Sequence, residues 1–114
     1  MSARNKLLAA PPYAVERALE RLGANLKTAR LRRNVTVSEA AERIGTGRRA
    51  VDSAEAGKAS TGIAVYAALL WAYGLLDPFV DVADPARDAE GRALARSREP
   101  SRARRTTGEI DDDF

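Results

Sequence analysis

The chain has 114 residues, with 19 Lys/Arg, 16 Asp/Glu, a formal net charge of +3, no cysteine and no histidine. This length accommodates one compact domain of about 70 to 90 residues with tails. Without cysteine or histidine, disulfides and the usual transition-metal ligands are missing, so metal-dependent and histidine-based catalysis are almost excluded and no cofactor is expected. No apolar run approaches a membrane span and the first ten residues are too polar for a secretory signal, so we expect a cytoplasmic protein.

The charges are arranged in blocks along the chain. Residues 1–57 carry eleven Lys/Arg against six Asp/Glu, and residues 91–107 carry six Arg against one Glu. Residues 58–90 hold two basic and five acidic groups, and the last seven residues hold four acids and no base. Two basic regions separated by an acidic one favour a polyanionic partner for the basic regions.

The first sustained pattern lies between Tyr13 and Arg33, where apolar residues recur at the 3, 4 spacing of one helix face. Pro12 suits the first turn of this helix. Gly23 lowers its helix propensity, so the pattern allows a kink or a break at that position. Residues 1–12 contain a Pro-Pro pair and no sustained period, which predicts a flexible arm.

Two short helices are predicted next. Thr36 and Glu39 have the spacing of a capping box, in which side chain and backbone satisfy each other at a helix start, and this helix ends near Ile44. The Gly-Thr-Gly run at 45–47 breaks it, and a further helix extends from about Gly47 to Ala56, with Gly57 as a natural stop. The side chains expected to face inward are Ala40, Ala41, Ile44, Ala50, Val51 and Ala54.

Ser60 or Thr61 is expected to cap a fourth helix that is apolar nearly all round and ends at Gly74. The pairs Asp77-Pro78 and Asp84-Pro85 each combine an N-cap residue with a proline, predicting helices at about 78–82 and 85–98. The segment after Pro100 lacks a core-forming pattern and is expected to be disordered in isolation. The chain is therefore predicted to be all-α, divided into an arm (1–12), a helical domain (13–83), a C-terminal helix (84–98) and a tail (99–114).

Two short helices joined by a tight Gly-containing turn form a helix-turn-helix, whose second helix enters the DNA major groove. The segment LKTARLRRNVTVSEAAERIGTGRRAVDSAEAGK resembles the lambda-repressor-like (Xre/Cro) family, through the small Ala41, the turn Gly45, the buried Val51 and the Glu-Ala-Gly-Lys ending at 55–58. The resemblance implies a five-helix DNA-binding domain with a C-terminal helical extension. It also implies that Arg30 pairs with Glu55, which orients Arg30 toward a phosphate.

A second resemblance covers GIAVYAALLWAYGLLDPFVDVADPARDAEGRALARSREPSRARR, which looks like the fourth helix and C-terminal extension of HipB-like antitoxins. It implies a homodimer that binds double-stranded operator DNA, represses its own operon and holds a HipA-like Ser/Thr kinase toxin. A free-standing Xre-type repressor and a helical adaptor with a decayed DNA-binding motif are the alternatives. An enzyme is remote because no nucleophile–base constellation is visible.

The base-reading residues are expected on the first two turns of the second motif helix: Arg48 and Arg49, with Ser53 as a weaker reader. Asp52 either accepts from a cytosine or, as we favour, braces Arg48 four residues before it. Phosphate contacts are expected from Arg30, Arg32, Thr36, Ser38, Thr46, Gly47, Lys58 and Ser60. Val37 stands where many family members have Gln, and Gly47 stands where a hydroxyl residue is common. These two departures leave open the alternative that the motif has lost DNA binding and is kept only for its fold.

We expect one apolar cluster to contribute both to the core and to a dimer contact, rather than to the core alone. Its members are Trp71, Tyr73, Leu75, Leu76 and Phe79. The basic tail, including Arg102, Arg104 and Arg105, either contacts DNA or is an ordinary solvated segment. The acidic end with Phe114 resembles a docking peptide, although a free end that improves solubility is the favoured interpretation.

Overall fold

The computed structural model describes residues 9–99, which form α-helices and a short 3-10 helix and contain no strand. The all-α fold class is therefore confirmed for this range. The chain divides into two compact units between Phe79 and Val80, and each is described by itself. Within the same range, no helix combines the length and the apolar character needed to cross a membrane. The expectations for Arg102, Arg104, Arg105 and Phe114 lie outside the described residues.

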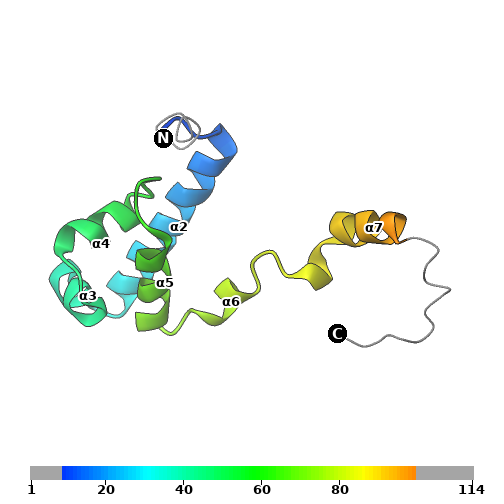
Figure 1. The fold of residues 1–114 in the computed structure, drawn as a ribbon. Helices are drawn as coiled ribbons and strands as arrows, with labels where there is room; N and C mark the ends of the chain where they lie inside the picture. Colours follow the sequence, from blue (N-terminus) through cyan, green and yellow to red (C-terminus); the bar gives the residue numbers. More distant parts are fainter. Residues whose placement is uncertain (1–8, 100–114) are drawn as a thin grey trace. The chain divides into compact units, whose positions relative to one another are not determined.

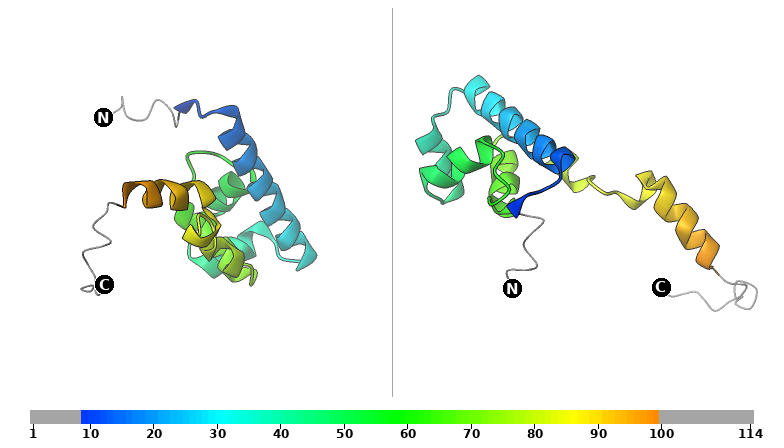
Figure 2. Two further views of the ribbon diagram at one scale, coloured as in Figure 1. Left: turned by 90° about the vertical axis from the view of Figure 1, so that its right-hand side faces the viewer. Right: turned by 90° about the horizontal axis from the view of Figure 1, so that it is seen from above.

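The first unit is built from four helices that pack on one another: α2 (Tyr13–Arg32), α3 (Val37–Ile44), α4 (Arg48–Glu55) and α5 (Ile63–Ala72) (Figure 1). The short α6 (Asp77–Val80) follows at the division between the units. Helix α4 contacts α2, α3 and α5, so it lies at the centre of the packing. The two helices of the motif, α3 and α4, lie side by side in each view (Figure 2).

The core of this unit is small and is filled from every one of these helices. Its largest fully buried side chains are Leu26 from α2, Val51 from α4 and Leu69 from α5. Alanines of both motif helices are also buried, Ala40 and Ala41 in α3 and Ala54 in α4, and small side chains allow two helices to approach closely. The buried set is Leu26, Ala29, Val35, Ala40, Ala41, Val51, Ala54, Tyr66, Leu69 and Tyr73.

The capping box at the start of α3 is present, as the sequence predicts. The hydroxyl of Thr36 accepts a hydrogen bond from the backbone N–H of Glu39 at 3.0 Å, and the Glu39 carboxylate accepts one from the backbone N–H of Thr36 at 2.9 Å. Gly45 ends the helix in the left-handed conformation, with φ of 77°. Glycine adopts this conformation without steric cost, which is why the turn begins there.

One possibility that the sequence leaves open, a break at Gly23, is not realised, and one expectation for a helix cap is wrong. Helix α2 runs through Gly23 without a break, because that glycine is buried against α4 rather than serving as a hinge. The residue that caps α5 is Gly62, which makes no side-chain hydrogen bond, so neither Ser60 nor Thr61 caps this helix. Instead, Thr61 has its hydroxyl oxygen buried, with no hydrogen-bond partner among the described residues.

The second unit contains a 3-10 helix, η2 (Pro85–Arg87), followed by α7 (Ala89–Arg98). The sequence predicts one continuous helix here, and the structure corrects this. The Asp84 carboxylate accepts a hydrogen bond from the backbone N–H of Ala86, and the Asp88 carboxylate accepts one from the backbone N–H of Gly91. Since Asp88 acts as a second N-cap, a new helix begins immediately after it.

Leu26→Ala is expected to lower the free energy of unfolding by about 2–5 kcal/mol, because it leaves a cavity at a side chain that is 1% exposed. The same change at Leu31, in the same helix but 58% exposed, is expected to stay within about 0.5 kcal/mol of the unmodified protein. Urea denaturation of both variants measures the difference. Equal losses at the two positions would contradict this description of the core.

Candidate nucleic-acid interface

The turn between α3 and α4 is short and fixed by backbone hydrogen bonds. The N–H of Gly45 donates to the carbonyl of Glu42 at 3.2 Å, and the N–H of Thr46 donates to the carbonyl of Ala41 at 2.9 Å. Gly47 then forms the N-cap of α4 in an extended conformation. A tight, glycine-containing turn between two packed helices is the geometry of a helix-turn-helix.

Helix α4 divides its side chains cleanly between the core and the surface. Val51 and Ala54 are fully buried, whereas Arg48, Arg49 and Asp52 are exposed. Ser53 is half-buried at the edge between these two faces. Of the residues that the sequence predicts as base readers, Arg48 and Arg49 lie at the exposed leading end of this helix, and Ser53 lies at the edge of its exposed face.

The leading end of α4 is unfavourable for the protein alone. No side chain caps the helix, and its first turn carries Arg48 and Arg49 but no acid. The N-terminus of a helix has a partial positive charge, so cations there are disfavoured by about 0.3–1 kcal/mol each while anions are favoured. A bound polyanion would reverse this penalty, and unbonded N–H groups at the helix start would add donors to it.

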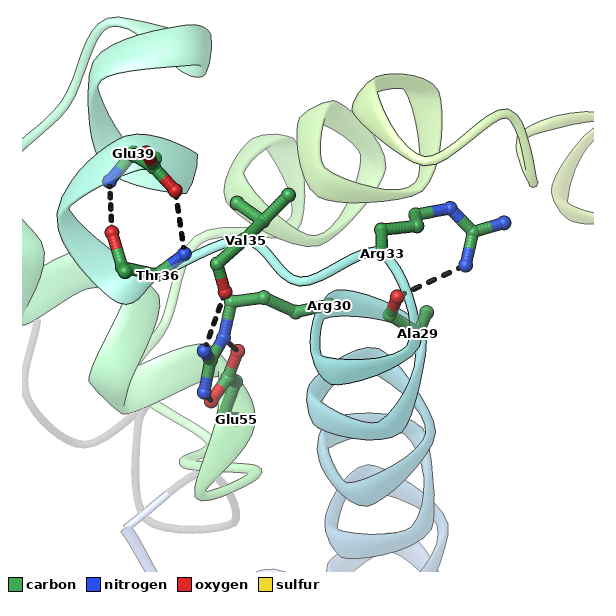
Figure 3. Close-up of polar contacts among 7 residues, drawn as sticks. All are labelled: Ala29, Arg30, Arg33, Val35, Thr36, Glu39 and Glu55. Atoms are coloured by element: carbon green, nitrogen blue, oxygen red, sulfur yellow. Dashed lines mark hydrogen bonds and ion pairs between the residues drawn. The ribbon is translucent and has the colours of Figure 1, made fainter.

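The opposite end of α4 is anchored by an ion pair within the protein. The Nε of Arg30 donates to one Glu55 carboxylate oxygen at 2.7 Å, and its Nη2 donates to the other at 3.0 Å (Figure 3). Its Nη1 donates to the backbone carbonyl of Val35 at 2.9 Å. Each side chain of the pair is 8% exposed. The pair expected from the resemblance is thus present, and it joins α2, the α2–α3 turn and the end of α4.

The carboxylate of Glu55, through its hydrogen bond to Arg30, raises the pKa of that guanidinium above its usual value, even though burial acts in the opposite direction. The pair with Glu55 therefore favours the charged form of Arg30. Because its donors face Glu55 and Val35, most of its hydrogen-bonding capacity is used inside the domain. Its expected phosphate contact stays a prediction that depends on the remaining N–H groups.

A shallow hollow of about 370 Å³ lies beside the start of α3 and includes several predicted phosphate contacts. The backbone N–H of Thr36 is bonded to the Glu39 carboxylate, but its hydroxyl only accepts from the backbone N–H of Glu39, so the O–H can still donate to a phosphate. The exposed side chains of Ser38 and Arg48 line the same hollow. The lining residues are Arg30, Leu31, Asn34, Val35, Thr36, Val37, Ser38 and Arg48.

Lys58 and Ser60 line a different hollow, shared with the acidic Glu16 and Glu20 of α2. Both predicted contact residues are exposed, and the Tyr66 hydroxyl donates to the backbone carbonyl of Lys58 at 3.0 Å, which ties their loop to α5. The structure thus separates the predicted phosphate contacts into two groups. Of the rest, Arg32 and Gly47 are exposed and Thr46 is half-buried.

The expected brace between Arg48 and Asp52 is not formed. Among residues 9–99, the ion pairs join Arg17 to Glu20 and Arg30 to Glu55, and Arg48 has none. Both Arg48 and Asp52 are exposed, where holding two side chains in one geometry costs entropy and gains little.

The predicted core and dimer cluster separates into two kinds of residue. Tyr73 belongs to the core, where burial raises the pKa of its phenol and the Arg33 guanidinium lies 5.8 Å from its ring centre. Trp71 is 62% exposed, and Leu75 is also exposed, while Leu76 and Phe79 are half-buried. The sequence-based list missed the 70% exposed Ile63, which lies eight residues before Trp71 and so belongs to the same broad face of α5.

Comparison with known families agrees with this geometry. Residues 21–81, more than half of the chain, match a family described as helix-turn-helix domain, so the chain belongs to this family. The family is Xre/Cro-like, and such a domain indicates a DNA-binding transcription regulator. Searches of curated proteins and of solved structures gave no match.

Glu55→Ala is expected to lower the free energy of unfolding by about 3–5 kcal/mol, because it leaves the buried Arg30 guanidinium without its counter-charge. Glu20→Ala is the matched control, since it breaks an exposed pair with Arg17 at 3.6 Å and is expected to cost at most about 1 kcal/mol. Thermal and urea unfolding measure both. Similar, small losses would show that the buried pair does not hold the domain together.

Proposed function

We propose that the protein is a sequence-specific transcriptional repressor that binds operator DNA as a homodimer, with α4 as the recognition helix. The observation that carries this proposal is the contrast between the two ends of α4. Its last residue is fixed by the buried Arg30–Glu55 pair, and its first turn presents two exposed arginines without a cap or an acid. A helix held in this way is suited to insertion of its N-terminal end into the major groove.

Base reading is assigned to Arg49 and Arg48, with Ser53 in a minor role. Arginine makes bidentate contacts to the O6 and N7 atoms of guanine, and each such contact contributes about 1–3 kcal/mol of discrimination. Since Asp52 is exposed and free of Arg48, it is available to accept from a cytosine N4. The operator half-site is therefore expected to contain guanine opposite the start of α4.

Phosphate contacts are assigned to the rim of this site. Ser38 and the leading backbone N–H groups of α3 and α4 supply hydrogen-bond donors, and Arg32 and Lys58 supply charge. These contacts set the register of the protein on DNA and contribute equally to the binding of every DNA sequence. The two positions that depart from the family pattern are accommodated: Val37 packs against the core, and Gly47 leaves the start of α4 open to a phosphate.

The outward face of α5 is the proposed dimer contact. This helix has no charged residue in its sequence IAVYAALLWA, yet Ile63 and Trp71 are largely exposed on it. The same face of a second copy is equally uncharged, so the two copies can pack together without burying an unpaired charge. A charged partner surface would have to bury one, which is costly. Two-fold symmetric regulators of this kind bind operators with two half-sites.

A finer assignment is that the protein is the antitoxin of a HipBA-like operon and also binds a kinase toxin. It is supported by the resemblance of residues 62–105 to HipB-like antitoxins. Co-expression with the product of the neighbouring gene tests it: a stable complex with a kinase-like protein supports the antitoxin. A protein that represses its promoter without such a partner is instead a free-standing regulator of the same family.

Arg49→Ala is expected to reduce the preference for the selected operator over a shuffled duplex by about 5- to 150-fold, because one bidentate base contact is lost. Lys58→Ala removes the same charge and is the matched control. It is expected to weaken binding to both duplexes equally and to lower the slope of log affinity against log salt by about one. Fluorescence anisotropy titrations over a range of salt concentrations measure both effects. An unchanged preference in Arg49→Ala would reject α4 as the reading helix.

Trp71→Ala is expected to weaken the dimer by about 2 kcal/mol or more, the typical cost of removing a central aromatic contact. Its fold should be unaffected, because the side chain is 62% exposed in one copy. Sedimentation equilibrium measures the change, with Leu31→Ala as a control at another exposed apolar side chain. Equal dimer affinity in the two variants would place the contact elsewhere.

A further inference from the structure

Gly23 lies at an unusually close contact between two helix backbones. It is buried in the middle of α2, and a Cβ placed on it would be 2.5 Å from the carbonyl oxygens of both Ala54 and Glu55. Real Cβ atoms are essentially never found so close to another heavy atom, and backbone atoms cannot rotate away as a long side chain can. Gly23 is therefore required by this contact and not by the conformation of α2, which is ordinary helix.

The same end of α4 is attached to α2 at two further points. The Glu55 carboxylate is held by Arg30, which lies on the C-terminal side of Gly23 in α2. On the other side, a Cβ on Gly57 would be 2.6 Å from the Glu20 Cα and from the Leu19 carbonyl oxygen. Three contacts on one helix thus fix the C-terminal end of α4 and the residues that follow it.

The N-terminal end of α4 is joined to α3 by the short hydrogen-bonded turn and is less crowded than the end near α2. A Cβ placed on its N-cap, Gly47, would meet nothing within 4 Å. An eight-residue helix is about 12 Å long, so a tilt of about 10° at the fixed end moves the leading end by about 2 Å. Displacement on this scale is enough to break hydrogen bonds to bases, whose useful range is a few tenths of an ångström.

We propose that Gly23 is a positioning residue that sets the orientation of the recognition helix, so that its contact with Ala54 and Glu55 determines base discrimination without touching DNA. This inference rests on the proposed function, in which α4 reads bases. A methyl group at Gly23 would push the end of α4 away from α2 and tilt the leading arginines. General binding to phosphates tolerates such a tilt, whereas bidentate base contacts do not.

The test compares Gly23→Ala with Gly62→Ala, whose added Cβ has open space around it and whose φ of −66° is suitable for alanine. Two readouts are taken on the full chain: the affinity ratio between a duplex selected from a random library and a shuffled duplex, and backbone amide NMR shifts. For Gly23→Ala the ratio is expected to fall by about fivefold or more, while affinity for the shuffled duplex is nearly retained. The amide changes should extend along α4, and Gly62→Ala should preserve the ratio.

A cooperatively folded Gly23→Ala protein with an unchanged ratio overturns the inference. So does a variant that does not fold even with a stabilising osmolyte, because the contact would then serve the core as a whole. If the unmodified protein selects no duplex, the proposed function fails, and the amide shifts alone decide whether Gly23 orients α4. Shifts extending along α4 then support the orienting role, and their absence rejects it.

Discussion

The buried pair of Arg30 and Glu55 is the interaction on which the arrangement of the motif depends. Removing two charges from water is costly, and the cost is offset only when geometry and hydrogen bonding are both good. Here the guanidinium makes two parallel bonds to the carboxylate and a third to the Val35 carbonyl. These bonds have fixed directions, whereas the alanine-rich packing around them is less specific. The pair therefore defines how α2, the turn after it and α4 meet.

This anchoring explains how a small domain tolerates an electrostatically unfavourable surface. Two arginines at the positive end of α4 repel the helix dipole and each other, and neither has an acidic partner within the described residues. A short helix is marginally stable by itself, so tertiary contacts must hold it. The fully buried Val51 and Ala54, together with Glu55, provide them. An anion bound at this exposed end would offset the repulsion.

The sequence predicts most of this architecture, because periodicity and capping are local properties. The limits of α2, the capping box of Thr36 and Glu39, and the positions of α3 and α4 all follow from spacing along the chain. The role of Gly23 does not follow from spacing. A glycine within a helix indicates low helix propensity, and its role in a close helix contact becomes visible only when the neighbouring backbone is known. The division of the C-terminal helix at Asp88 was also missed, although an N-cap residue there was a usable signal. Which predicted phosphate contacts share a hollow depends on tertiary packing, which no local pattern encodes.

The two faces of α4 have consequences for how this regulator can diverge. The buried face is occupied by residues that fix the fold, and the exposed face carries Arg48, Arg49 and Asp52. Exposed substitutions away from caps and buried pairs usually change stability by less than about 0.5 kcal/mol. Under the proposed function, duplicated copies of such a protein would acquire new operators by changing a few of these exposed positions. Recombination of these positions among relatives would likewise yield new specificities on an unaltered scaffold.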